Sequence, residues 1–222
     1  MEYLLEYKEY KKLKSNYWTK RISISKIQLE DICNKLNISS LKVKFLSSGK
    51  YGNAYKIGDK VLKITTDKTE ANSISNLISN NINNKSIVKY YSINQYKLNN
   101  QYVYVIVMDY LIPIMDYINK KTNINYNSFL NLLLDIIYEK WSDISKSEFN
   151  NLIEEHYSID KIPKFSKELI DKIWKLYEDL HYLEKCPDLH IGNLGINKNE
   201  DIQLFDFNDL KNIRKFNKVN II

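Results

Sequence analysis

Two carboxylates and one amide stand close together near the end of the sequence. Asp188 and Asn193 lie in the stretch CPDLHIGNLG, and Asp206 follows the apolar run IQLF. A carboxylate can orient an attacking hydroxyl, and carboxylate or amide oxygens can bind the magnesium ion that bridges nucleotide phosphates. Asp188 suits the first task, and Asn193 and Asp206 suit the second. A turn between two strands explains one such residue, but it explains the combination poorly.

Two glycines, Gly49 and Gly52, stand between strand-like runs in SSGKYGNAYKI. Glycine lets the backbone approach a bound group closely, with N–H groups directed at phosphate oxygens. The alternative is a hairpin turn that needs a positive φ. For this stretch taken alone, the turn is the favoured interpretation.

A lysine lies within a run that predicts a buried strand. Lys63 is flanked by Val61, Leu62 and Ile64. A buried ammonium group is costly unless it meets an anion, so this position is typical of a lysine that binds one. The alternative is an edge-strand lysine that reaches solvent along its apolar stem.

Glu70 is the candidate partner for that lysine. A lysine that grips phosphates is commonly held by a carboxylate on the adjoining helix. Between Lys63 and Asp109 the only acids are Asp67 and Glu70, and a helix is predicted to start at Asp67. The competing interpretation is that Glu70 merely completes a capping box with Asp67.

The elements that must position these residues predict an α+β fold. Alternating apolar residues and β-branched or aromatic runs predict strands, and three-to-four-residue apolar spacing predicts helices. The order is strands, one helix and strands, then helices, then a final pair of strands joined by KNED. The predicted strands are 41–49, two within 53–65 joined at Gly58-Asp59, 87–93, 102–110, 194–197 and 202–207, and the main predicted helices are 67–80, 128–141 and 166–185.

Taken in order, these stretches resemble the motifs of the protein-kinase-like superfamily. SSGKYGNAY, VLKI, Glu70, MDYLIP, PDLHIGN and LFDFN are similar to its glycine-rich loop, strand lysine, helix glutamate, hinge, catalytic loop and metal-binding motif. The DLHxGN form is also similar to aminoglycoside and choline phosphotransferases and to small viral or phage kinase-like proteins. The resemblance covers about residues 41 to 210.

The resemblance implies a bilobal kinase-like fold. A helical extension at 1–40 would precede a five-stranded N-lobe at 41–110 and a reduced helical C-lobe at 111–222. The sequence ends at Ile222, soon after Asn208, so the activation segment and the helices that usually dock a peptide would be shortened.

The resemblance also implies ATP and Mg²⁺ as cofactors and a role for each residue. Lys63 would bind the α- and β-phosphates, steadied by Glu70, and Asp188 would be the catalytic base. Asn193 and Asp206 would bind Mg²⁺. The other implied ATP-binding positions are Ser47, Ser48, Gly49, Lys50 and Gly52 in the loop, and Met108, Asp109, Tyr110 and Leu111 around the adenine.

The activity that the resemblance favours is a protein Ser/Thr kinase, with another protein or the chain itself as acceptor. One alternative is a catalytically inactive pseudokinase that binds a nucleotide or a partner. The other is a small-molecule kinase of the aminoglycoside or choline type. Three departures from the family pattern bear on the choice: Ser47 replaces the first glycine, Cys186-Pro187 replaces His-Arg, and Asn208 replaces the glycine of the metal motif.

The charge and composition of the chain limit the kinds of partner and compartment that we expect. The net charge of +6 favours anionic partners, an acidic protein among them, but the lysines form no long block, so nucleic acid is an unlikely partner. Two cysteines form no disulfide framework, and no run is long enough to span a bilayer, so we expect a cytoplasmic protein. A zinc site at His181, Cys186 and His190 is the alternative metal hypothesis, although its spacing matches no standard site. The oligomeric state is not predicted.

Overall fold

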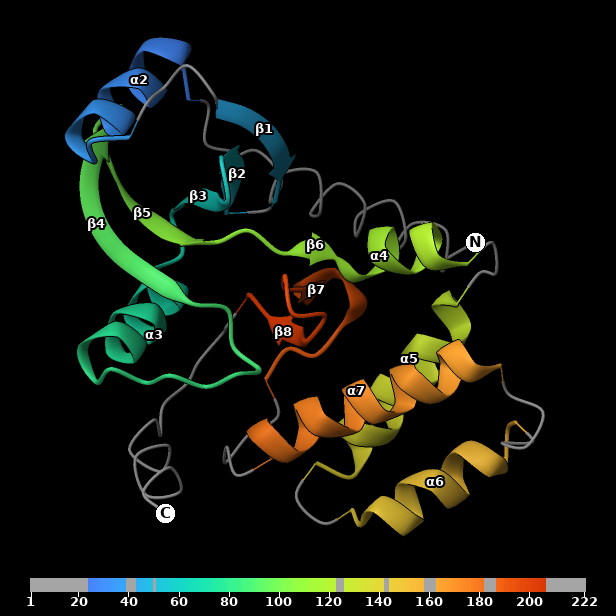
Figure 1. Ribbon diagram of the computed structural model, residues 1–222. Helices are drawn as coiled ribbons and strands as arrows, with labels where there is room; N and C mark the ends of the chain where they lie inside the picture. Colours follow the sequence, from blue (N-terminus) through green and yellow to red (C-terminus); the bar gives the residue numbers. More distant parts are fainter. Residues whose placement is uncertain are drawn as a thin grey trace, which may run out of the picture. The chain divides into compact units, whose positions relative to one another are not determined.

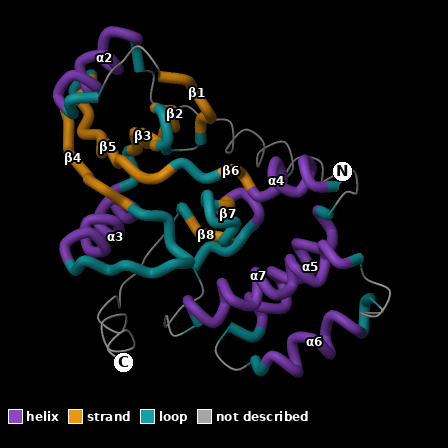
Figure 2. Tube along the Cα trace, viewed as in Figure 1, coloured by secondary structure: helices purple, strands orange, loops and turns teal. Residues whose placement is uncertain are grey.

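The protein has a mixed α+β fold, as the sequence predicts, in a computed structural model that describes residues 24–38, 43–49, 51–122, 126–141, 144–157, 163–181 and 187–206. The chain divides into two compact units (Figures 1 and 2). The first runs as far as Ala71 and includes Tyr91–Met108. The second contains Asn72–Tyr90 and the residues from Asp109 onward.

A five-stranded antiparallel sheet in the order β1-β2-β3-β5-β4 is the main feature of the first unit. Gly58 has a φ of +62°, and it forms with Asp59 the two-residue turn between the second and third strands, which confirms the predicted hairpin. The strands are β1 (Val43–Ser48), β2 (Gly52–Ile57), β3 (Lys60–Thr65), β4 (Tyr90–Leu98) and β5 (Gln101–Asp109).

In the described part of this unit, helix α2 (Lys26–Lys35) packs on the core. It begins with a capping box between Ser25 and Gln28, and it buries Ile32 and Cys33. These side chains join the buried residues of the sheet, Tyr55, Leu62, Ile64, Val103, Val105 and Val107. Most of the helical extension predicted at 1–40 lies outside the described residues. Its described part is 24–38, and α2 is the helix within that part.

The helix that follows β3, α3 (Lys68–Ser79), confirms the helix predicted at 67–80. The predicted strand at 87–93 starts later than expected, because β4 begins only at Tyr90. The preceding residues pair with Leu204: Leu204 N–H donates to Ser86 O at 2.9 Å and Val88 N–H donates to Leu204 O at 3.0 Å. That pairing joins residues far apart in sequence, so local periodicity could not reveal it.

The described residues of the second unit form four further α-helices and a small sheet. In Figure 1, α5 and α7 lie side by side, and their apolar faces form the core with α6. The helices are α4 (Ile114–Lys121), α5 (Asn127–Glu139), α6 (Lys146–Glu154) and α7 (Lys164–Leu180). Among the described residues, no helix is both long and apolar enough to cross a membrane.

The small sheet carries the candidate polar residues at its ends. Its order is β6-β7-β8, and each neighbouring pair is antiparallel. A short 3-10 helix, η3 (Ile191–Asn193), leads into it. The strands are β6 (Ile112–Pro113), β7 (Leu194–Ile196) and β8 (Ile202–Leu204), and the last two confirm the predicted terminal hairpin.

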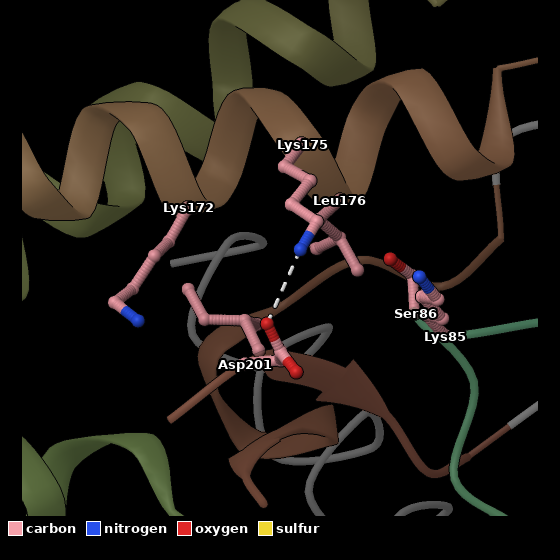
Figure 3. Close-up of a pocket in the computed structure, with 7 residues that line it drawn as sticks. Lys85, Ser86, Lys172, Lys175, Leu176 and Asp201 are labelled. Atoms are coloured by element: carbon pink, nitrogen blue, oxygen red, sulfur yellow. Dashed lines mark hydrogen bonds and ion pairs between the residues drawn. The ribbon is translucent and has the colours of Figure 1, made fainter. Parts of the chain in front are cut away.

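Lysines from two helices hold the turn of this hairpin. Lys175 of α7 lies 3.2 Å from Asp201 Oδ1, beside a small hollow that Ser86 also lines (Figure 3). Lys172 donates to the Glu200 carbonyl, and Lys121 of α4 lies 3.1 Å from the Glu200 carboxylate. These contacts fix the turn to α4 and α7, and they thereby also fix β7 and β8, the strands on either side of it.

The ion pair at this turn predicts a pH-dependent contribution to stability. Burial on its own raises the pKa of Asp201, but hydrogen bonds from Lys175 and Asn197 outweigh it and lower the pKa below 3.8. A carboxyl with a lowered folded-state pKa contributes stability above its ordinary pKa, and this is lost as the pH falls through the folded value. We therefore expect Asp201→Asn to lower the free energy of unfolding by about 0.2–1 kcal/mol at neutral pH.

Urea unfolding of both proteins across a pH series measures this difference. The gap between wild type and Asp201→Asn is expected to shrink as the pH falls below 3.8. A gap that stays constant over the series would show that the hydrogen-bonded charge of Asp201 is not what stabilises the turn.

Candidate functional site

An ion pair between β3 and α3 forms the first part of the candidate site. Lys63 Nζ lies 2.5 Å from Glu70 Oε1, and both residues belong to the first unit. The Glu70 side chain is 3% exposed and that of Lys63 is 18% exposed. The structure thus brings together the two residues that the sequence pairs, and Lys63 is not a lysine that reaches freely into solvent.

The start of α3 explains how Glu70 reaches the lysine. Asp67 Oδ1 accepts hydrogen bonds from the N–H groups of Thr69, at 2.8 Å, and Glu70, at 3.2 Å. The N–H of Asp67, which a capping box would direct at Glu70, donates to Thr65 Oγ1 at 3.1 Å. Asp67 therefore caps the helix as predicted, while the carboxylate of Glu70 is directed at Lys63.

The glycine-containing segment forms a closed hairpin turn. Gly49 N–H donates to Gly52 O at 2.8 Å, and Tyr51 O accepts from Thr66 N at 2.8 Å. Ser47 and Ser48 are exposed on β1, and Lys50 lies outside the described residues. The stretch is thus a hairpin turn in which the N–H of Gly49 is used. The expected reason for the glycines is wrong, because neither Gly49 nor Gly52 has a positive φ; in the described residues the glycine with a positive φ is Gly58.

Gly52 has a structural reason of its own to be glycine. A Cβ atom at this position would lie 2.1 Å from Ile64 O on the neighbouring strand, which is far inside van der Waals contact. A Cβ at Gly49 would lie 3.9 Å from its nearest neighbour among the described residues, the Gly52 carbonyl oxygen. The two glycines of the turn therefore differ sharply in their tolerance of a side chain.

This difference predicts opposite outcomes for two alanine variants. Gly52→Ala is expected to lower the free energy of unfolding by about 1–3 kcal/mol, because β2 must move away from β3 to make room. Gly49→Ala is the matched control and is expected to change stability little. Chemical denaturation of the three proteins measures both effects, and equal stability of the two variants would contradict the close approach at Gly52.

The loop before η3 carries the candidate base. The Asp188 side chain is 51% exposed, whereas the neighbouring Leu189 is buried and anchors the loop in the core of the second unit. His190 Nδ1 accepts from Gly192 N–H at 3.0 Å, so the imidazole braces the loop. Because Nδ1 is an acceptor, neutral His190 carries its proton on Nε2, which lies 3.7 Å from Asp188 Oδ2.

Asn193 is tied to the same loop. It is 6% exposed, and its Nδ2 lies 3.0 Å from the backbone oxygen of Asp188. A carbonyl oxygen only accepts hydrogen bonds, so the amide nitrogen must face it. Oδ1 of Asn193 is then the atom of this side chain that a metal ion would contact.

The segment of Asp206 lies beside Asn193. Phe205 N–H donates to Asn193 O at 3.1 Å, and Phe205 O accepts from Tyr90 Oη at 2.9 Å. The residue before Asp206 is thus fixed through both its N–H and its carbonyl. Sequence reasoning did not single out Tyr90, although a half-buried tyrosine hydroxyl usually has a polar partner.

The predicted adenine-contacting segment comprises the last two residues of β5 and the two residues that precede β6. Met108 and Leu111 are buried, while Asp109 and Tyr110 are half-buried. Asp109 N–H donates to Lys89 O at 3.0 Å. The segment is therefore well packed.

The oxygen ligands present suit magnesium, which prefers carboxylate and amide oxygens. Across the described ranges, no group of three or more His, Cys, Asp or Glu side chains is placed to hold a metal ion. The magnesium hypothesis instead uses Asn193, Asp206 and the nucleotide phosphates together. Cys186, on which the zinc hypothesis depends, and Asn208 lie outside the described residues.

Comparison with known proteins gives no family for this chain. No protein-family model matches it, and no curated protein matches it. The functional argument therefore rests on the residues and on the geometry described above.

Proposed function

We propose that the protein is an ATP- and Mg²⁺-dependent phosphotransferase with a protein-kinase-like bilobal fold. The observation that carries the proposal is the Lys63–Glu70 pair, in which a carboxylate 3% exposed faces an ammonium group that retains some exposure. A buried ion pair gives little net stability compared with apolar packing. A lysine held in this way is typical of one kept in place for an anionic ligand.

The order of elements supports the kinase-like part of the proposal. The first unit has five strands in the order β1-β2-β3-β5-β4, and the helix that carries Glu70 follows the strand that carries Lys63. The second unit is rich in helices and presents Asp188 and Asn193 just before a short hairpin. This is the arrangement that the resemblance implies.

Each residue has a defined task in the proposed reaction. Lys63 binds the α- and β-phosphates of ATP, and Glu70 fixes its ammonium group. Asp188 accepts a hydrogen bond from the acceptor hydroxyl and takes its proton as the γ-phosphate is transferred. Asn193 Oδ1 and the Asp206 carboxylate hold Mg²⁺, which neutralises charge on the phosphates when bound.

The acceptor that we propose is a Ser or Thr hydroxyl of a protein, with the chain itself as one candidate. The exposed Asp188 carboxylate supports this choice, because a hydroxyl on a large molecule can reach it. The net charge of +6 favours an acidic protein as partner.

A label-transfer assay tests the proposal. The purified protein is incubated with Mg²⁺ and γ-labelled ATP alone, with a generic acidic protein, with a generic basic protein, and with an aminoglycoside or choline as small-molecule acceptor. Asp188→Ala and Asp206→Ala are assayed in parallel. Label on a protein or on the chain itself, lost in both variants, supports a protein kinase, and label on the small molecule alone selects that alternative. ATP binding without transfer above the variants would identify a pseudokinase.

A further inference from the structure

We infer that Tyr90 is a positioning residue for the metal-binding carboxylate of Asp206. The inference rests on the proposed function, since it assigns a residue to the same metal site. It begins from one contact: Tyr90 Oη donates a hydrogen bond to Phe205 O at 2.9 Å, across 115 positions of sequence.

The contact acts on the peptide group that joins Phe205 to Asp206. That group is planar, so the direction of the Phe205 carbonyl also sets the position of the Asp206 nitrogen. The N–H of Phe205 donates to Asn193 O at 3.1 Å, which fixes the preceding peptide group as well. Asp206 therefore starts from a backbone held on one side by Tyr90 and on the other by Asn193.

Hydrogen bonds to β8 and α7 restrain the segment just before Tyr90. Val88 N–H donates to Leu204 O, and Ile87 forms a parallel bridge with Leu204. Upstream, Ser86 Oγ donates to Asp179 Oδ2 of α7 at 2.6 Å. The segment that carries Tyr90 is thus paired with β8, the strand that leads directly to Asp206.

The network links both proposed metal ligands. Asn193 contributes its backbone oxygen to Phe205 and its side-chain nitrogen to the backbone of Asp188. Loss of the Tyr90 hydroxyl would release the Phe205 carbonyl but leave the bonds of Asn193 in place. The expected result is a looser Asp206 carboxylate and weaker metal binding, with the nucleotide contacts of the first unit unchanged.

Tyr90→Phe isolates the hydroxyl, because it keeps the ring and its packing. Tyr91→Phe is the matched control, since Tyr91 is the next residue and is 40% exposed. Mn²⁺ serves as the probe, and its binding in the presence of a non-hydrolysable ATP analogue is followed by electron paramagnetic resonance. Affinity for the analogue without metal and the thermal unfolding midpoint are measured on the same samples.

Tyr90→Phe is expected to raise the Mn²⁺ dissociation constant by about two- to tenfold, the range that one hydrogen bond supports. Metal-free affinity for the analogue is expected to match wild type, as is every property of Tyr91→Phe. Replacement of Tyr90 by 4-aminophenylalanine retains a donor at the same ring position and is expected to restore Mn²⁺ binding.

Three results would count against the inference in different ways. If wild type binds Mn²⁺ with the analogue and Tyr90→Phe binds it equally well, Tyr90 does not position the metal site, and the proposed function stands. If wild type binds no Mn²⁺ with the analogue, the proposed function fails and the inference fails with it. Should Tyr90→Phe unfold under assay conditions, weak Mn²⁺ binding by the folded 4-aminophenylalanine protein would overturn the inference.

Discussion

Asp188→Asn is expected to lower transfer of the γ-phosphate from ATP by about 10²- to 10⁴-fold, the range associated with loss of a general base. Asparagine keeps the shape of the side chain but cannot take the proton of the acceptor hydroxyl. Asp188 is half-exposed, and its backbone oxygen, not its carboxylate, holds Asn193. ATP affinity and stability are therefore expected to stay close to those of wild type.

Initial rates of transfer, ATP titrations and thermal unfolding measure these effects together. Asp135→Asn makes the same chemical change at an exposed position of α5 and is the matched control. Full activity of Asp188→Asn would show that Asp188 is not the general base. A large loss of stability would mean that the carboxylate has a structural task that the present assignment lacks.

Lys63→Met is expected to affect both stability and activity. The change leaves the Glu70 carboxylate, 3% exposed, without the ammonium group that faces it. Breaking a buried pair from one side costs about 3–5 kcal/mol of unfolding free energy. Transfer is expected to fall by about 10²- to 10³-fold as well, the range for loss of one stabilising group at a developing charge.

A double variant separates the two effects. Lys63→Met combined with Glu70→Leu replaces the whole pair with apolar side chains, which is often neutral or stabilising. We expect most of the lost stability to return while transfer stays as low as in the single variant. Lys97→Met, at an exposed position of β4, controls for loss of a lysine from the same sheet. Recovery of transfer in the double variant would show that Lys63 acts only through stability.

Much of the architecture follows from local sequence signals. The Gly58-Asp59 hairpin, the cap at Asp67 and the helical stripes of α5 and α7 depend on neighbours within a few residues. The Lys63–Glu70 pair could also be predicted from the sequence, because one strand and the start of the next helix position both residues.

The features that sequence analysis missed depend on contacts between distant residues. The need for glycine at position 52 comes from the carbonyl of Ile64 on the adjacent strand, which residue patterns do not show. The late start of β4 and the bond from Tyr90 to Phe205 both depend on contacts with Leu204 and Phe205, which lie far along the sequence. Spacing can identify candidate side chains, but only the fold shows which neighbours hold them.

The most direct test of the central claim is to compare ATP labelled on the γ-phosphate with ATP labelled on the α-phosphate. Wild type is predicted to transfer the γ-label to a protein hydroxyl only when Mg²⁺ is present, and to transfer no α-label. Asp188→Ala and Asp206→Ala are predicted to transfer neither. Transfer of the α-label would indicate a nucleotidyl transferase, and γ-label transfer by wild type no greater than by the two variants would contradict the assignment of a phosphotransferase.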